Sequence, residues 1–268
     1  MNHLENTNRP FYLAFTVALS LLLSVGCSYE PPENYEQLTP IEQSIAKQSR
    51  WSKDRKKDSS RKPKEILALS GVKSGDRVVD LLGGGGYYSE LFSHVVGDDG
   101  EVYLQNNSLF LRFSEKEMEK RLANNRLPNV KRLDSEYADM QLPNDIDLMF
   151  LGLCFHDFYV PRDDPIITPD AESMFEQIRK AMKPGGKILV IDHAAADNTG
   201  KTAAPTLHRI EREFVTEEFS RQGFQLESGS EILANSEDDH SLIIWNEDIM
   251  GNTDKMVFLF SYPGPKSE

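Results

Sequence analysis

The sequence predicts an α/β fold in which a doubly wound, mostly parallel, seven-stranded sheet carries helices on both faces. From residue 63 onward, short apolar segments alternate with amphipathic ones, which is typical of parallel strands joined by helical crossovers. Two of these segments, 146–155 and 187–193, are largely apolar, as expected of strands that are buried on both faces. A glycine-rich turn, Gly83 to Gly86, joins the first strand to the next helix.

The first half of the domain is predicted to begin with a helix over residues 63–71. Pro63 suits the first turn of that helix, and Gly71 suits its end. The next predicted elements are strand 76–82, helix 87–97, strand 100–106, helix 114–127 and strand 129–133.

The second half continues the alternation and ends with two strands. The predicted elements are strand 146–155, helix 171–182, the turn KPGG at 183–186, strand 187–193, helix 208–224, strand 225–233 and strand 255–263. No internal repeat is evident.

Residues 1–26 are predicted to be a lipoprotein-type signal peptide. The apolar run from Phe11 to Val25 is short for a membrane span and suits a signal-peptide core. Small residues before Cys27 resemble a bacterial lipobox, so we expect lipid on Cys27 and a protein anchored to the membrane in the bacterial periplasm. An uncleaved signal anchor and a secreted soluble form are the alternatives.

Three segments are expected after the signal peptide. Residues 27–39 are polar and contain prolines, as in a tether. Residues 40–62 form a basic helical extension, and residues 63–268 form the α/β domain. The basic charges are expected to make a solvated helix face, with contact to anionic lipid headgroups as the alternative.

Charge and cysteine content restrict the partners. The net charge of -13 argues against nucleic acid, because phosphate binding needs clustered Lys and Arg. Only Cys27 and Cys154 are present, so lipid on Cys27 would leave no intrachain disulfide. Cys154 lies in an apolar run and is expected to be a buried small hydrophobe.

The four glycines are expected to serve a ligand. In an open parallel sheet, ligands bind beyond the carboxyl ends of the strands, and glycine lets them approach the backbone closely. A tight turn without a ligand is the simpler explanation, and a glycine-rich turn alone is weak evidence. NAD and FAD proteins share this strand–turn–helix arrangement.

The order of the remaining segments resembles class I S-adenosylmethionine (SAM)-dependent methyltransferases. The similar segments are VVDLLGGGGYYS at 78–89, GEVYLQN at 100–106, LPNDIDLMFLGLCFHD at 142–157 and AMKPGGKILVIDH at 181–193. A closer resemblance is to a bacterial family of predicted methyltransferases that often carry signal peptides. It rests on RKPKEIL, GGGGYYSE, LHRI, GFQLESGSEILANSEDDHS and DKMVFLF.

This resemblance implies a Rossmann-like methyltransferase domain with SAM as cofactor. The residues that it places at the cofactor are Asp80, Gly84, Gly85, Gly86, Tyr87, Asn106 and Asp139. Asp80 would face the methionine end, and Asp134 or Glu136 could replace Asp139 at the adenine. The sequence departs from the family at Leu82, where the first glycine is usual, and at Asn106, where an acid usually holds the ribose.

Three histidines are candidates for the acceptor side: His156, His193 and His208. His156 follows one predicted strand, His193 ends the neighbouring one, and His208 opens the next predicted helix. One hypothesis is general-base catalysis. The other is a metal held by His156, His193, Asp157 or Asp192, but no compact ligand spacing is present, so no metal is predicted. Residues 234–251 are interpreted as either a lid or a solvated acidic loop.

The most favoured function is SAM-dependent methyl transfer to a small-molecule acceptor. One alternative is a non-catalytic or divergent SAM- or nucleoside-binding lipoprotein, because a fold does not fix function. The other is a different reaction on the same scaffold. The predicted location conflicts with the favoured function, because SAM is made in the cytoplasm and a periplasmic enzyme would need imported SAM.

Overall fold

The computed structural model describes residues 29–265. The predicted signal peptide and Cys27 lie outside the described residues, so the predictions about them remain predictions. The chain divides into two units, Met1–Glu30 and Pro31–Glu268, and only the second is discussed below. Within residues 29–265, no helix combines the length and hydrophobicity that a membrane span needs.

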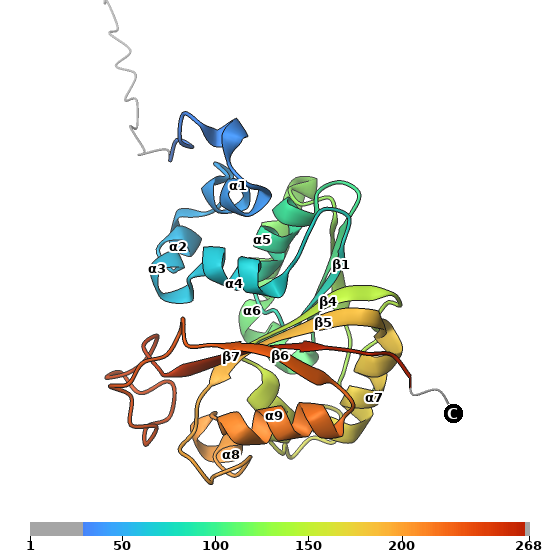
Figure 1. Ribbon diagram of the computed structural model, residues 1–268, viewed down its shortest axis with the longest axis vertical. Helices are drawn as coiled ribbons and strands as arrows, with labels where there is room; N and C mark the ends of the chain where they lie inside the picture. Colours follow the sequence, from blue (N-terminus) through green and yellow to red (C-terminus); the bar gives the residue numbers. More distant parts are fainter. Residues whose placement is uncertain (1–28, 266–268) are drawn as a thin grey trace, which may run out of the picture. The chain divides into compact units, whose positions relative to one another are not determined.

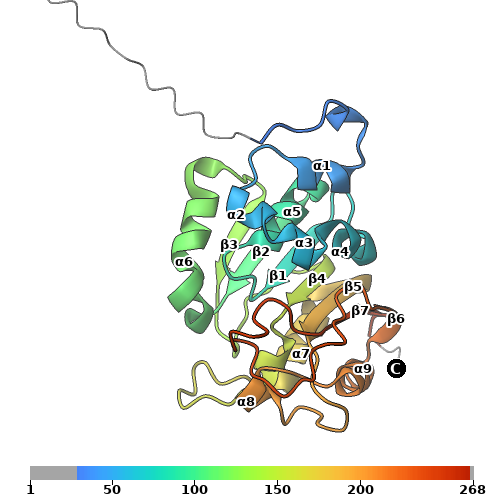
Figure 2. The ribbon, with the colours of Figure 1, turned by 90° about the vertical axis from the view of Figure 1, so that its left-hand side faces the viewer.

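A seven-stranded sheet forms the centre of the unit, in the order β3-β2-β1-β4-β5-β7-β6, which Figure 2 shows from left to right. The strands are β1 (Arg77–Leu81), β2 (Glu101–Asn106), β3 (Val130–Asp134), β4 (Ile146–Gly152), β5 (Met182–His193), β6 (Gln225–Ser230) and β7 (Lys255–Ser261). Strands β1 to β5 pair in parallel, and β7 runs antiparallel to β5 and β6. The predicted mostly parallel sheet is confirmed.

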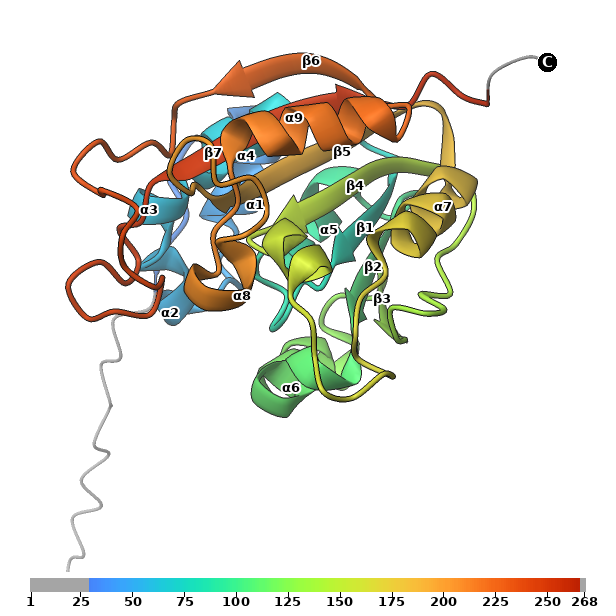
Figure 3. The same ribbon diagram turned by 90° about the horizontal axis from the view of Figure 1, so that it is seen from below.

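Helices cover both faces of the sheet, as predicted (Figures 1 and 3). One face carries α4 (Pro63–Ser70), α5 (Tyr87–Val96) and α6 (Ser108–Leu122), which continues into η2 (Ala123–Asn125). The other carries η3 (Phe155–Tyr159), α7 (Ala171–Ala181), α8 (Ala204–Leu207) and α9 (Arg212–Arg221).

The alternation of side chains along the strands builds a separate core on each face. Val78 belongs to the cluster beneath α4 and α5, whereas Val79 belongs to the cluster beneath α7 and α9. Cys154 is fully buried in the second cluster, and its thiol donates to the Leu81 carbonyl oxygen at 3.3 Å. The prediction that Cys154 is a buried small hydrophobe is therefore confirmed.

The basic segment 40–62 packs onto this scaffold. After η1 (Tyr35–Gln37) it forms α1 (Pro40–Ala46), α2 (Ser52–Arg55) and α3 (Asp58–Arg61). The Ser44 hydroxyl donates to the Leu91 carbonyl of α5 at 2.8 Å. Arg50 is only 5% exposed and pairs with Asp58 at 2.8 Å. The expectation of a solvated charged face is therefore wrong for Arg50, because this segment is held by buried polar contacts.

The helix predicted over 208–224 is shorter in the structure, and His208 does not open it. His208 instead ends α8 with a left-handed backbone (φ 54°). Ile210 then forms a parallel bridge with Ala194, and the chain enters α9 only at Arg212. A residue held in an extended bridge cannot continue a helix, which explains the shorter α9.

The KPGG turn at 183–186 lies within β5. The register between β4 and β5 shifts here: Ile146 pairs with Met182, and Leu148 pairs with Lys187. Gly185 has φ 81°, a conformation that glycine adopts readily.

Candidate active site

A cleft of about 610 Å³ lies at the carboxyl ends of β1, β4 and β5. Figure 1 shows α3 and the 231–254 segment on the same side of the molecule, and residues from both line the cleft. Its size is in the range of small-molecule and cofactor sites.

The glycine loop, Gly83 to Gly86, forms one wall of this cleft, and Asn106 at the end of β2 holds it by hydrogen bonds. The Gly84 N–H donates to Asn106 Oδ1 at 2.8 Å, and Asn106 Nδ2 donates back to the Gly84 carbonyl oxygen at 3.0 Å. A Cβ atom added at Gly83 would lie 2.5 Å from Asp80 Cγ, whereas one at Gly84 would meet nothing closer than Ser114 Cβ at 3.9 Å. Gly84 therefore presents open backbone to the cleft.

Asp80 ends β1 beneath this loop and is only 2% exposed. Its carboxylate accepts from the Ser89 hydroxyl at 2.5 Å, at the start of α5. Burial raises the pKa of Asp80 to about 6, against the opposing effect of the Ser89 hydrogen bonds and of Arg61. Asp80 is thus a buried carboxyl group whose ionisation is disfavoured, and it lies in the wall of a ligand-sized cleft. Such a combination is found at functional sites.

We expect Asp80→Asn to stabilise the ligand-free protein at pH 7.5. The raised pKa means that Asp80 adds stability below pH 4 and that this stability is lost as the pH rises through about 6. The shift corresponds to roughly 2–3 kcal/mol. Urea unfolding of both proteins at pH 4 and pH 7.5 should show a gain in free energy of unfolding for the variant only at the higher pH. A variant that is less stable at pH 7.5 would contradict this assignment.

The other proposed cofactor residues separate into two groups. Gly84, Gly85 and Tyr87 line the cleft with Asp80. Gly86 precedes α5 as its N-cap, Asn106 lies fully buried behind Gly84, and Asp139 is exposed away from the lining.

Arg61, Glu117 and Phe113 line the cleft and were not predicted. Trp245 and Met250 also line it, but they belong to the 234–251 segment that was a candidate lid. Arg61 of α3 faces the cleft, with its guanidinium 4.4 Å from the centre of the Tyr87 ring. Glu117 of α6 and Asp80 are the two carboxylates among the described lining residues. Three large hydrophobics in the lining are strongly exposed: Phe113 (71%), Trp245 (56%) and Met250 (62%). The clustered basic charge of residues 40–62 was the only sequence signal for Arg61.

The structure brings the three candidate histidines together. The ring centres of His156 and His193 are 6.1 Å apart, and those of His156 and His208 are 5.2 Å apart. His193 alone lines the cleft, and its Nδ1 lies 2.7 Å from the Thr253 hydroxyl. His208 packs against Trp245, with ring centres 4.3 Å apart.

The environment shifts the pKa of His193 and His208 downward and that of His156 upward. Burial lowers the pKa of His193 to about 3 and that of His208 to about 4. Burial also lowers the pKa of His156, but Asp192 outweighs it, so that the net shift is upward. His193 is therefore a neutral imidazole at pH 7, suited to hydrogen bonding and weak as a base.

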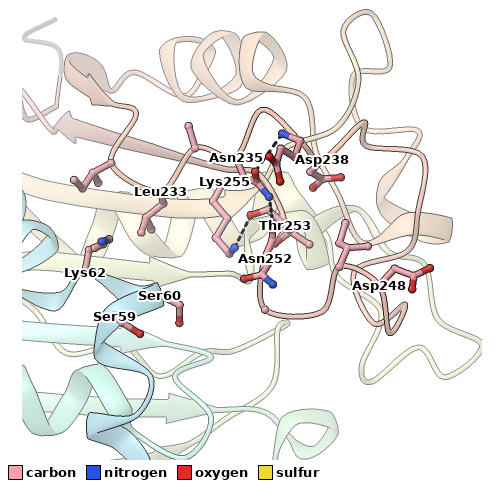
Figure 4. Close-up of a pocket in the computed structure, with 15 residues that line it drawn as sticks. Ser59, Ser60, Lys62, Leu233, Asn235, Asp238, Asp248, Asn252, Thr253 and Lys255 are labelled. Carbon is pink, nitrogen blue, oxygen red and sulfur yellow. Dashed lines mark hydrogen bonds between the residues drawn. The ribbon is translucent and has the colours of Figure 1, made fainter.

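A second hollow of about 520 Å³ adjoins the cleft, and the two share Ser60, Leu233, Gly251 and Lys255 in their linings. Figure 4 shows Lys255 between the 231–254 segment and α3, with its ammonium bonded to the Thr253 carbonyl oxygen at 2.6 Å. Burial lowers the pKa of Lys255 to about 8. The 234–251 segment thus lines both spaces at Gly251 and the cleft alone at Trp245, while Asp239 remains exposed.

Comparisons with known proteins agree with the fold. No family model matches the chain. The chain is 27% identical over 139 residues to the ubiquinone/menaquinone biosynthesis C-methyltransferase UbiE of Teredinibacter turnerae, covering 51% of this chain and 50% of that protein. It is 29% identical over 129 residues to the UbiE of Shewanella baltica, covering 47% and 46%. The chain thus spans about half the length of these curated relatives.

Two solved structures share the fold over most of this chain. A SAM-dependent methyltransferase from Aquifex aeolicus has a TM-score of 0.54 at 21% identity, covering 78% of this chain and 97% of that chain. The putative methyltransferase of Haloferax volcanii, in complex with the Trm112 activator, has a TM-score of 0.56 at 16% identity, covering 80% and 97%. The chain has the class I methyltransferase fold. The expected fold resemblance is confirmed.

Leu82 shows how this chain departs from the usual glycine pattern of the methyltransferase fold. It adopts φ 51°, a left-handed conformation that favours glycine. Its side chain is 3% exposed and belongs to the core cluster that also contains Tyr137. Hydrophobic burial of Leu82 offsets the strain of this left-handed backbone, about 1–2 kcal/mol.

Proposed function

We propose that this protein is a SAM-dependent methyltransferase that acts on a small apolar acceptor. The observation that carries the proposal is the pairing, in one cleft, of open glycine backbone at Gly84 with an apolar mouth. The relatives' names and the solved methyltransferases support the reaction class.

The residues of the cleft fit SAM. The free face of Gly84 allows close backbone approach. Asp80 offers a carboxylate to an ammonium group, and Arg61 offers a guanidinium to a carboxylate. The end of β2 offers no acid for the ribose, because Asn106 stands there and its amide is hydrogen-bonded to Gly84. Glu117 is the candidate to take the place of that acid.

When bound, SAM supplies an electrophilic methyl group on a sulfonium. The protein's part is to align the acceptor and exclude water. Phe113, Trp245 and Met250 form the apolar mouth, and exposed hydrophobics grouped in this way favour an apolar ligand. His193, neutral and held by Thr253, offers a hydrogen bond to a polar atom of the acceptor.

The acceptor class follows from this lining. Aromatic side chains at the mouth favour stacking with a flat ring, and the curated relatives are named for quinone C-methylation. We therefore propose a hydroxylated aromatic compound or a quinol as acceptor.

A lipid anchor at Cys27, in the bacterial periplasm, is part of the same proposal. A membrane-tethered domain would meet apolar acceptors at the lipid surface. Labelling cells with a fatty acid should mark the protein and fail to mark a Cys27→Ser variant.

Methyl transfer is the direct test. The full chain is incubated with SAM that carries a labelled methyl group and with a panel of hydroxylated aromatics and quinols. The expected result is transfer of label to one acceptor class. A folded protein that binds SAM but labels none of them would support the alternative, a non-catalytic SAM-binding protein, which the missing ribose acid at Asn106 favours.

A further inference from the structure

Three side chains outside the proposed cofactor wall meet at one point. His156 Nε2 lies 3.2 Å from His208 Nδ1 and 3.6 Å from Asp157 Oδ2. Asp157 Oδ1 lies 4.0 Å from His208 Nδ1. One ligand atom from each residue fits within 4.8 Å of the others, although His208 is far from the other two in sequence.

His156 is held in a fixed orientation from behind. Its Nδ1 lies 2.8 Å from Asp192 Oδ1. The backbone N–H groups of His156 and His193 both donate to Asp192 at 2.7 Å, so that carboxylate is itself fixed. Because Nδ1 then carries the proton that Asp192 accepts, Nε2 presents its lone pair toward His208 and Asp157. A carboxylate behind a ligating histidine is a recurrent arrangement at metal sites.

The other two groups are also positioned. His208 has a left-handed backbone at the end of α8, and its ring packs on Trp245. Asp157 is buried and accepts a hydrogen bond from Arg162 through Oδ1 at 2.9 Å. Its other oxygen, Oδ2, is the one that faces His156.

The structure assigns His156, Asp157 and His208 as a binding site for one divalent transition-metal ion, with Zn²⁺ as the best fit. Two imidazoles and one carboxylate are a known Zn²⁺ ligand set that leaves a fourth position open. Tetrahedral Zn²⁺ at its usual bond lengths places ligand atoms about 3.4 Å apart. The separations of His156 Nε2 from His208 Nδ1 (3.2 Å) and from Asp157 Oδ2 (3.6 Å) differ from this value by about 0.2 Å. All three ligand atoms lie within 4.8 Å of one another, so Asp157 and His208 must approach each other when the ion binds.

The site borders the proposed acceptor space. Trp245 lines the cleft and packs on His208, and His193 lines the cleft next to His156. An ion here would offer its open position to an oxygen of the acceptor. A hydrogen bond from His208 to His156 is the competing explanation for their short separation, and the ion pair with Arg162 is the competing explanation for the position of Asp157.

The test is metal binding by the full chain after removal of metals with a chelator. Titration with Zn²⁺ gives stoichiometry and affinity, and Co²⁺ gives a visible absorption spectrum that reports coordination. We expect one ion per chain and the intense spectrum of four-coordinate Co²⁺. His208→Gln and Asp157→Asn should each weaken Zn²⁺ binding by about 100-fold or more. His240→Gln, which lies outside the cluster and pairs with Asp254, should bind as the wild type does.

Two results would overturn the assignment. One is a folded wild-type protein that binds neither ion or gives only an octahedral Co²⁺ spectrum. The other is variants that remain folded in thermal unfolding and bind Zn²⁺ as tightly as the wild type. Metal binding is measured without SAM, and titration of the same samples with S-adenosylhomocysteine shows separately whether the proposed cofactor cleft works.

Discussion

Replacing Gly84 with aspartate removes binding of SAM and S-adenosylhomocysteine but leaves the protein folded. The new side chain projects into the cleft, where a Cβ meets no atom closer than 3.9 Å, so it fills ligand space without striking the core. It also adds negative charge to a cleft that already contains Asp80 and Glu117. We expect a loss of affinity of about 100-fold or more, equivalent to roughly 3 kcal/mol, in a calorimetric titration.

Gly71→Asp is the matched control for this variant. Gly71 has φ 68°, near the 57° of Gly84, and has nothing within 4 Å of an added Cβ, but it ends α4 outside the cleft lining. Both variants carry a similar left-handed strain of about 1–2 kcal/mol. If the control loses binding as completely as Gly84→Asp, or if Gly84→Asp binds normally, the glycine loop is not the cofactor wall.

Replacing Arg121 with methionine gives the largest expected loss of stability. Arg121 is fully buried and pairs with Asp54 at 2.8 Å, with Glu117 at 3.2 Å and with Glu90. Its Nε also donates to the Gly85 carbonyl oxygen. Methionine keeps much of the volume but leaves buried carboxylates without their cation, which costs about 3–5 kcal/mol. The midpoint of thermal unfolding should fall by roughly 10 °C.

An exposed ion pair provides the comparison. Lys180 pairs with Glu176 at 2.6 Å, and both side chains are mostly exposed, so Lys180→Met should change the free energy of unfolding by less than about 1 kcal/mol. A similar small effect for Arg121→Met would show that its carboxylate partners find other cations, such as Arg126 beside Glu90. The contacts by which Arg121 joins α2 to the glycine loop would then contribute little to the free energy of unfolding.

The sheet was predictable because its signal is local. Largely apolar strands such as 146–152, and glycines where the chain turns, reflect burial and backbone freedom that each segment carries by itself. The position of Asp80 at the end of β1 follows from the same pattern. The break at His208 was not predictable, because it depends on the bridge between Ile210 and Ala194, a contact between distant segments.

The cleft was only partly predictable for the same reason. Arg61 reaches it because α3 folds back against Tyr87, and no spacing in the sequence records that contact. Asn106 lies where the pattern placed it, but its amide is used to hold Gly84. The proposed metal site joins His156 and His208 only through tertiary folding, so no short ligand spacing in the sequence indicates it.

The most direct test of the central claim is calorimetric titration of the full chain with S-adenosylhomocysteine. We predict one site per chain with a micromolar dissociation constant, a binding free energy of about −8 kcal/mol. Gly71→Asp should retain this binding and Gly84→Asp should lose it. A folded wild-type protein that shows neither heat of binding nor a rise in unfolding temperature up to about 1 mM ligand would contradict the assignment of this cleft to SAM.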